Sequence, residues 1–307
     1  MVKNVLVTGA YGLIGGIVYS HLQARPERYT AYAMARRRFR SERVGESREL
    51  IISDERFTLS DLSDLDILVQ ALRGIDVVVH LAAEPRADAP WESVLDSNVI
   101  GVRNVFEAAR IAGVKRVVYA SSVMVSWGYQ TEEPYRSIFQ GRYDQLSPQD
   151  VTPVTHEWPT RPTSYYPASK VWGEALGRVY ADVHGLSVIC VRIGWVNDED
   201  RPHTYEWARA GWCSQRDVVQ MMERSIQAPD EVRFDIFYAM SNNKWNWVDI
   251  DHAREVLDTS PRTAQRSGWQ RLTKRKKDPT GTYLLRHPSI VAQLTARRES
   301  GINAQAR

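Results

Sequence analysis

A tyrosine, a lysine and a serine are the residues of this sequence best suited to chemistry. Tyr166 and Lys170 are four residues apart, so on a helix their side chains share one face. A phenol has a pKa near ~10 and exchanges protons poorly at neutral pH, but an ammonium group one turn away favours the phenolate. Ser122 ends an earlier Val-rich run and can donate a hydrogen bond to a substrate oxygen. Together they predict proton exchange with a hydroxyl or carbonyl group.

Three glycines near the start predict a dinucleotide site. Gly9, Gly12 and Gly15 follow a short apolar run at 4–7 and open an apolar-periodic segment over 13–22. In a strand, glycine turn and helix, the backbone approaches a diphosphate and the helix N-terminus presents free N–H groups to it. A nicotinamide held there would exchange hydride while the tyrosine exchanges a proton. The alternative for the glycines alone is an ordinary tight turn.

Alternating strands and helices predict an α/β fold, a Rossmann-type doubly wound parallel sheet. Continuous apolar runs, separated by helical segments, are typical of parallel strands that helices cover on both faces. Ligands of such sheets bind at the carboxyl ends of the strands, where Gly9, Ala83 and Ser122 lie. His80 lies inside one apolar run, and we expect it to be a core residue.

The expected domain organisation is a large domain followed by two smaller parts. A dinucleotide-binding domain spans 1–194 and contains an irregular insertion over 129–163, which we expect to cover the site. A small substrate-binding lobe follows over 195–260. The basic segment over 261–307 is interpreted as a C-terminal extension.

The end of the second expected strand bears on the choice of cofactor. Ala35 stands where an acid would bind the ribose hydroxyls of NAD, and it is followed by Arg36, Arg37 and Arg38. Basic residues there accommodate the 2′-phosphate of NADP, so we expect NADP to be favoured over NAD, with Arg36 and Arg37 as ligands. The alternative is a basic surface loop. Asp61, at the end of the next strand, is placed to meet the adenine.

The composition is that of a soluble globular protein. Hydrophobic residues make up 43% and charged residues 25% of the chain, and the net charge is +3. These values give no reason to expect a nucleic-acid or membrane partner. The two cysteines form no disulfide framework, and Met1 is followed at once by the first strand, so we expect a cytoplasmic protein. We expect no metal ion.

The chain resembles the extended short-chain dehydrogenase/reductase superfamily. The matching segments are Thr8–Gly15 (TGAYGLIG), Asp61-Leu62, His80–Ala83 (HLAA), Asn98–Gly101 (NVIG), Ala120–Ser122 (ASS) and Tyr166–Lys170 (YPASK). The resemblance implies an NAD(P)-dependent enzyme with Ser122, Tyr166 and Lys170 as its catalytic triad, and with Asn98 supporting the lysine through a water. Beyond the residues above, it implies cofactor contacts at Tyr11, Leu13, Ile14, Leu62, Leu81, Ala82, Ala83, Ser121, Tyr166, Lys170 and Ile193.

Within that superfamily the chain is similar to the group of uronate dehydrogenases and archaeal NAD-dependent glucose-6-phosphate dehydrogenase. Glu84–Leu95, Arg192–Gly194 and Trp212–Asp217 resemble segments of that group. The resemblance implies oxidation of a cyclic sugar at its anomeric hydroxyl to a lactone. The substrate contacts it implies are Glu84, Arg86, Ser122, Val123, Trp195, Trp207 and Arg209.

The chain departs from the pattern of this group on the substrate side. Val123-Met124 replaces an Asn-His pair, Trp195 replaces a serine, and Trp207 stands at the place of an arginine, with Arg209 nearby. Buried hydrogen-bond partners determine the selectivity of a site for polar substrates. Because these changes replace polar groups by apolar ones, the sequence supports the reaction type more than it supports uronate as the specific substrate. We expect a sugar or sugar-derived small molecule.

Two further functions remain open. A nucleotide-sugar epimerase needs a large pocket, for which residues 195–258 are short, and a non-catalytic cofactor sensor would not need the triad. A 4,6-dehydratase would have an Asp-Glu pair at Val123-Met124. The helices expected at 91–112 and 165–184 form a dimer interface in many superfamily members, so we expect a homodimer.

Overall fold

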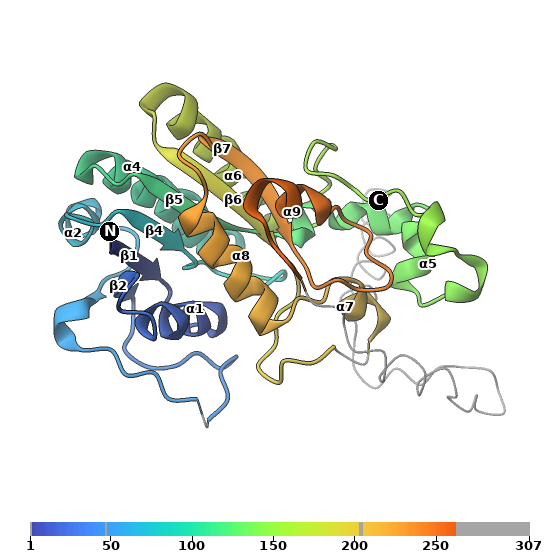
Figure 1. Cartoon of the computed structure of the whole chain (residues 1–307), viewed down its shortest axis with the longest axis horizontal. Coiled ribbons are helices and arrows are strands. Elements are labelled where there is room, and N and C mark those ends of the chain that lie inside the picture. Colours follow the sequence, from blue (N-terminus) through green and yellow to red (C-terminus); the bar gives the residue numbers. More distant parts are fainter. Residues whose placement is uncertain (1, 47, 203–204, 262–307) are drawn as a thin grey trace, which may run out of the picture. The chain divides into compact units, whose positions relative to one another are not determined.

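A seven-stranded, fully parallel sheet forms the centre of the structure (Figure 1). The computed structural model describes residues 2–46, 48–202 and 205–261, except for the side chain of Gln145. The strand order β3-β2-β1-β4-β5-β6-β7 confirms the predicted doubly wound α/β fold. The strands are β1 Lys3–Thr8, β2 Tyr29–Ala35, β3 Phe57–Leu59, β4 Val77–His80, β5 Arg116–Ser122, β6 Ser187–Ile193 and β7 Phe234–Ala239.

Helices pack on both faces of the sheet because successive strand side chains point to opposite sides. Val5 and Val7 belong to one hydrophobic core, and Leu6 between them belongs to the other. The first core includes α1 (Leu13–Gln23), α8 (Gln215–Gln227) and α9 (Asp251–Leu257). The second core includes α2 (Leu65–Ala71), α4 (Gly101–Ala112) and α6 (Tyr165–His184).

The helix expected over 91–112 contains a wider turn in its middle. It consists of α3 (Trp91–Val94), the π-helical segment η2 (Leu95–Ile100) and α4, and Gly113 in the left-handed region ends it. Such π-helical turns occur frequently at functional sites. Asn98 lies on η2 and is completely buried.

The segment between β5 and α6, which contains the expected insertion over 129–163, consists of short helices and turns joined by irregular stretches. It contains the 3₁₀ helix η3 (Val123–Thr131), the helix α5 (Tyr135–Phe139), and the short 3₁₀ turns η4 (Tyr143–Gln145) and η5 (Pro148–Asp150). Tyr129, Tyr135 and Phe139 are buried, and Val154 forms a parallel bridge to Val248. Such turns are too short to show a period in sequence, and the insertion over 129–163 and its place over the site stay predictions.

The expected small lobe over 195–260 contains β7, which is an edge strand of the central sheet. β7 pairs in parallel with β6, from Val188↔Phe234 to Ile193↔Ala239. Its helices α8 and α9 join the core that also contains α1. Residues 262–307, which make up the expected basic C-terminal extension except for Pro261, lie outside the described residues.

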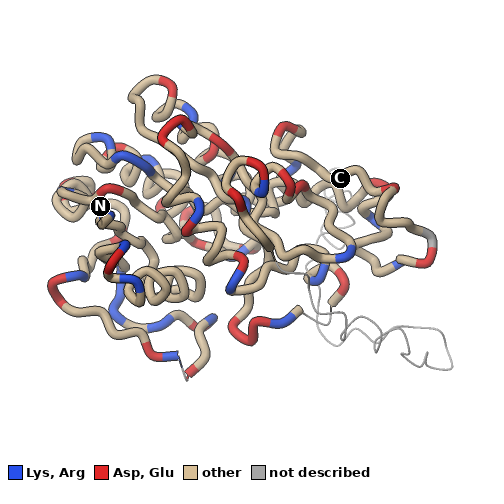
Figure 2. Tube along the Cα trace, viewed as in Figure 1, with Lys and Arg blue, Asp and Glu red and all other residues tan. Residues whose placement is uncertain are grey.

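Basic and acidic residues are interspersed along the described part of the chain (Figure 2). Within that part, no helix combines the length and the apolar character that crossing a membrane requires.

Candidate active site

The predicted site residues meet at the carboxyl ends of the central strands. β1 lies between β2 and β4 in the sheet, so the chain turns in opposite directions from the ends of β1 and β4. This switch point is where doubly wound sheets bind their ligands. The glycine turn follows β1, Leu81–Ala83 follows β4, and Ser122 ends β5.

The turn after β1 has the conformation that a dinucleotide site requires. Gly9 has φ +71°, and a Cβ there would lie 2.9 Å from backbone atoms of Ala82. A Cβ on Gly15 would lie 2.1 Å from the carbonyl oxygen of Gly9, so α1 approaches the turn as closely as glycine permits. Gly12 caps α1 without a side-chain hydrogen bond. The first N–H groups of the helix thus remain available, and the turn fits a diphosphate.

Thr8 and His80 hold the neighbouring strand end in place. Thr8 Oγ1 accepts the N–H groups of Leu81 and Ala82, each at 3.1 Å, and lies 2.8 Å from His80 Nδ1. Because its oxygen is occupied by two donors, the Thr8 hydroxyl donates to the imidazole. Burial and the charge of Lys170 lower the pKa of His80 to about 3. His80 is therefore a neutral core residue that positions residues 81–82.

The structure brings Ser122, Tyr166 and Lys170 together. α6 begins at Tyr165, so Tyr166 and Lys170 lie on successive turns, with Lys170 Nζ 5.7 Å from the centre of the tyrosine ring. Burial raises the pKa of the Tyr166 phenol, and its hydrogen bond with the Ser122 side chain lowers it. Lys170 is 3% exposed, and this burial lowers its pKa to about 8 although Glu174 opposes the shift. The lysine can therefore change its charge near neutral pH.

Asn98 connects the strand-end loop to the first turn of α6. Its Oδ1 accepts the Glu84 N–H at 2.8 Å, and its Nδ2 donates to the Glu84 carbonyl and to Ser169 Oγ, both at 3.0 Å. Ser169 Oγ in turn donates to the carbonyl oxygen of Tyr166 at 2.7 Å. Asn98 therefore joins the backbone of Glu84 to Ser169, and through Ser169 to the backbone of Tyr166. A water-mediated role toward Lys170 stays a prediction.

A buried polar network behind the site was missed in the sequence. Ser121 Oγ donates to Glu174 Oε1 at 2.6 Å, and Arg192 donates to both oxygens of Glu174 at 2.9 and 2.8 Å. The Tyr238 hydroxyl accepts a hydrogen bond from Arg192 Nη1 at 2.8 Å and forms a second hydrogen bond with Ser126 Oγ at 2.7 Å. The hydroxyl of Ser121 is thus engaged with α6. The spacing of Glu174, one turn after Lys170, is the signal that could have identified it.

The residues expected at the adenosine end differ in how they are engaged. Arg38 donates to the carbonyl oxygen of Ile52 at 2.8 Å and forms an ion pair with Asp54. Arg36 is exposed and has no ion pair among the described residues. Asp61 accepts from the Ser63 N–H at 2.8 Å, and the hydrogen bonds from Ser63 lower its pKa. Arg36 lies near enough to Asp61 for its charge also to lower the pKa of that carboxyl.

The remaining residues of the predicted cofactor site line the same strand ends. Leu13 and Ile193 are buried, Ile14 and Leu81 pack against the first core, and Ala82 and Ala83 are partly exposed. Tyr11 packs edge-on against Phe57, and Arg37 lies over the ring of Phe39. The carbonyl oxygen of Leu62 accepts from Asn104 at 2.9 Å.

Aromatic rings gather where substrate contacts were predicted. Trp207, on α7 (Glu206–Ala210), lies with its ring centre 5.0 Å from Trp195 and 6.5 Å from Trp127, and Tyr205 stacks on it. Val123 is buried. These residues form a largely apolar group, which we call the aromatic cluster.

The charged residues predicted at the substrate side are already paired. Arg209 is 8% exposed and forms an ion pair with Glu206 at 3.0 Å. Glu84 forms an ion pair with Arg86 at 3.0 Å and accepts from Ser93 at 3.2 Å. Arg209 therefore does not stand as an unengaged ligand for a sugar acid.

Comparisons with known proteins agree with this geometry. The family model described as "NAD dependent epimerase/dehydratase family" matches residues 5–197. The chain is 32% identical to the NAD-dependent glucose-6-phosphate dehydrogenase of Haloferax volcanii, over 85% of this chain and 94% of that protein. It is 30% identical to the uronate dehydrogenase of Pseudomonas syringae, over 85% and 82%. A mutant uronate dehydrogenase from Agrobacterium tumefaciens complexed with NAD has a similar structure, with TM-score 0.68, 27% identity and coverage of 91% and 92%.

Proposed function

The chain belongs to the NAD dependent epimerase/dehydratase family, and we propose that it is an NAD(P)-dependent dehydrogenase of a sugar or sugar-derived small molecule. The observation on which this rests is the meeting of Ser122, Tyr166 and Lys170 at the sheet edge where the glycine turn also lies. The full-length similarity to sugar dehydrogenases supports redox turnover over epimerisation.

Each residue of the triad has a distinct task in this proposal. Tyr166 accepts the proton of the substrate hydroxyl during oxidation and returns it during reduction. Ser122 donates a hydrogen bond to the same substrate oxygen and orients the phenol. Lys170 stabilises the phenolate by its charge. A nicotinamide bound beside them supplies the hydride acceptor or donor.

The aromatic cluster favours a substrate with an apolar face. Trp127, Trp195 and Trp207 present mainly ring faces and edges, with one indole N–H donor each. The C–H face of a sugar ring can pack on such a surface, whereas a carboxylate would find few hydrogen-bond donors there. We therefore favour a neutral sugar over a uronate as the substrate.

The cofactor preference and the cell compartment belong to the same proposal. NADP is favoured over NAD because Arg36 has no ion pair among the described residues. The free, buried cysteines Cys190 and Cys213 suit the reducing cytoplasm.

A homodimer is supported by exposed apolar side chains on two adjoining helical stretches. Large exposed hydrophobic residues lie on α3 to α4 and on α6, and they are Trp91, Ile100, Ile111, Tyr165, Trp172, Val179 and Val183. The two stretches contact one another through α4 and α6. Apolar surface gathered in this way marks a protein interface.

The test is the reduction of NAD(P)+ by a panel of aldoses and uronates and the oxidation of NAD(P)H by a panel of ketones, both followed by the absorbance of the reduced nicotinamide. Tyr166→Phe should lower kcat by about 10²- to 10⁴-fold while cofactor affinity stays within about twofold. Tyr165→Phe is the matched control, because Tyr165 is exposed beside it on the same helix. Cofactor binding without turnover of any substrate would support the sensor instead, and inversion of a nucleotide sugar without net reduction would support the epimerase.

A further inference from the structure

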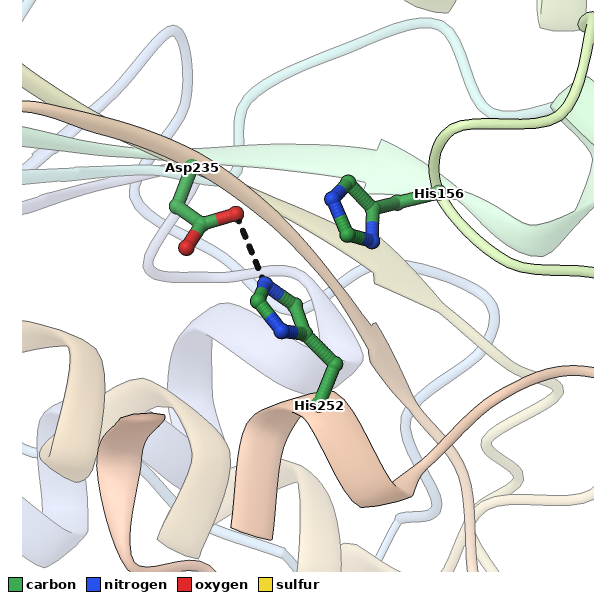
Figure 3. Close-up of side chains that lie close together, drawn as sticks. All are labelled: His156, Asp235 and His252. Atoms are coloured by element: carbon green, nitrogen blue, oxygen red, sulfur yellow. Dashed lines mark hydrogen bonds and ion pairs between the residues drawn. The ribbon is translucent and has the colours of Figure 1, made fainter. Parts of the chain in front are cut away.

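Two histidines and an aspartate from three separate segments of the chain converge beside β7. His156 follows the short turns between β5 and α6, Asp235 lies on β7, and His252 lies on α9. One nitrogen of each histidine and one oxygen of the aspartate all lie within 4.8 Å of one another. Figure 3 shows the three side chains directed toward a common point. We call them the His-Asp-His cluster.

Contacts within the cluster leave one side chain uncommitted. His252 Nε2 lies 2.9 Å from Asp235 Oδ1, and that oxygen also accepts the Ile236 N–H at 2.7 Å. His156 stacks on His252 with ring centres 4.3 Å apart, yet neither of its nitrogens hydrogen-bonds to another described residue. A histidine that faces a His–Asp pair without a partner of its own is available as a ligand.

The protonation state of the cluster suits metal binding. Burial and the adjacent ring of His252 lower the pKa of His156, and the facing groups Asp235, Glu157 and Arg192 add smaller effects. This shift favours the neutral imidazole, which is the form that binds metals. The side chains of His252 and Asp235 are 24% and 20% exposed, so an ion can enter from solvent.

The donor set is specific for one class of ion. Imidazole nitrogen with one carboxylate is typical of zinc and related divalent transition metals, whereas calcium and magnesium prefer oxygen ligands alone. Tetrahedral zinc with bonds of about 2.0–2.1 Å requires donor atoms about 3.3 Å apart. His252 Nε2 and Asp235 Oδ1 lie 2.9 Å apart, so they would separate by a few tenths of an ångström around the ion. The ligand atom of His156 lies within 4.8 Å of both and would move closer to bind as the third ligand.

We propose that His156, Asp235 and His252 bind one divalent transition-metal ion of the Zn²⁺ class, which takes the place of the proton shared by His252 and Asp235. Solvent completes the coordination. The ion fastens the segment before α6 to β7 and α9, next to the backbone pairing of Val154 with Trp247 and Asp249. Its role is structural, because none of its ligands contacts Tyr166 or Lys170. No ligand pattern is visible in the sequence, since the three residues lie far apart along it.

The test is metal binding by the whole chain, measured by titration calorimetry with Zn²⁺ after treatment with a chelator. The wild type should bind one Zn²⁺ per chain, and its Tm should rise by several degrees at saturation. Co²⁺ should give the visible absorption of a tetrahedral complex. Affinity should fall by at least tenfold between pH 7.5 and pH 5.5, because protons compete for imidazole.

Variants distinguish this site from other histidines. His156→Asn and His252→Gln should each weaken Zn²⁺ binding at least tenfold and abolish the Co²⁺ spectrum, and circular dichroism verifies that they fold. His184→Asn, at the exposed end of α6, and the double variant His203→Asn/His287→Asn should bind as the wild type does. The proposal is overturned if the wild type binds no Zn²⁺, or if His156→Asn binds it equally well. His156→Asn should keep the NAD(P) turnover of the wild type. Loss of the metal site can therefore be distinguished from loss of the proposed function.

Discussion

Glu174 and Arg192 form a two-point ion pair directly behind the triad. Nε and Nη2 of the arginine lie 2.9 and 2.8 Å from the two carboxylate oxygens, and the side chains are only 6% and 2% exposed. Glu174 lies one turn after Lys170 on α6, while Arg192 lies on β6. The pair therefore joins the catalytic helix to the sheet and places a negative charge near the lysine.

Breaking this pair should destabilise the fold and alter Lys170. Glu174→Gln leaves the guanidinium of Arg192 buried without its counter-charge, which costs about 3–5 kcal/mol of unfolding free energy. Since Glu174 raises the pKa of Lys170, the variant should also shift the alkaline limb of the kcat profile to lower pH. Urea unfolding and a pH–rate profile measure both effects. Asp182→Asn is the control, because Asp182 forms an exposed pair with Arg178 on the same helix. Equal losses in the two variants would contradict this prediction.

Replacing Lys170 should change activity and stability in opposite directions near neutral pH. Lys170→Met should lower kcat by about 10²- to 10⁴-fold, because the phenolate of Tyr166 loses its stabilising charge. The folded pKa of about 8 lies below the unfolded value of 10.5, so the folded protein releases this proton first as pH rises. The contribution of Lys170 to stability therefore increases between pH 8 and pH 10.5, by up to about 1.4 kcal/mol per pH unit.

Urea unfolding at pH 7.5 and pH 9.5 measures this contribution. Lys170→Met should have a higher unfolding free energy than the wild type at pH 7.5, and this difference should become smaller at pH 9.5. Lys115→Met changes a 78% exposed lysine and serves as the control. Its difference in unfolding free energy from the wild type should not decrease between pH 7.5 and pH 9.5. An identical pH dependence in Lys170→Met and the wild type would rule out titration of the lysine in this range.

Cofactor preference should depend on one arginine rather than on the charge of the loop. Arg36→Ala should weaken NADP binding by about tenfold, the worth of one charge-assisted hydrogen bond, and leave NAD binding within twofold. Arg38→Ala removes the same charge, but Arg38 is engaged with Asp54 and Ile52, so NADP affinity should change little. Fluorescence titration with both dinucleotides checks this. If the wild type binds NAD and NADP equally, the proposed preference is wrong.

The oligomeric state should respond to the exposed apolar face of α6. Trp172→Glu places a charge at a 43% exposed tryptophan of that face and should convert a dimer into monomers. Ile51→Glu changes a residue that is 72% exposed elsewhere and should leave the dimer intact. Light scattering over a range of protein concentrations gives the mass. A wild type that is monomeric throughout would remove the dimer proposal.

Much of the fold and part of the site could be predicted from the sequence. The apolar runs that became β1, β4, β5 and β6 are visible because strands buried on both faces must be continuously hydrophobic. The glycine turn is visible because Gly9 and Gly15 occupy positions where a Cβ would collide with backbone. Tyr166 and Lys170 are paired by helical spacing alone. All three signals are local, so they appear in a single stretch of chain.

Only the tertiary structure decided which distant residues become neighbours. The partnership of Glu174 with Arg192, the engagement of Arg209 by Glu206, the addition of β7 to the sheet and the convergence of His156 on Asp235 and His252 have no local pattern. Each depends on packing between elements, where burial determines which polar groups must find a partner. The sequence thus determined the chemistry available at the strand ends, and the folded arrangement determined which charges surround it.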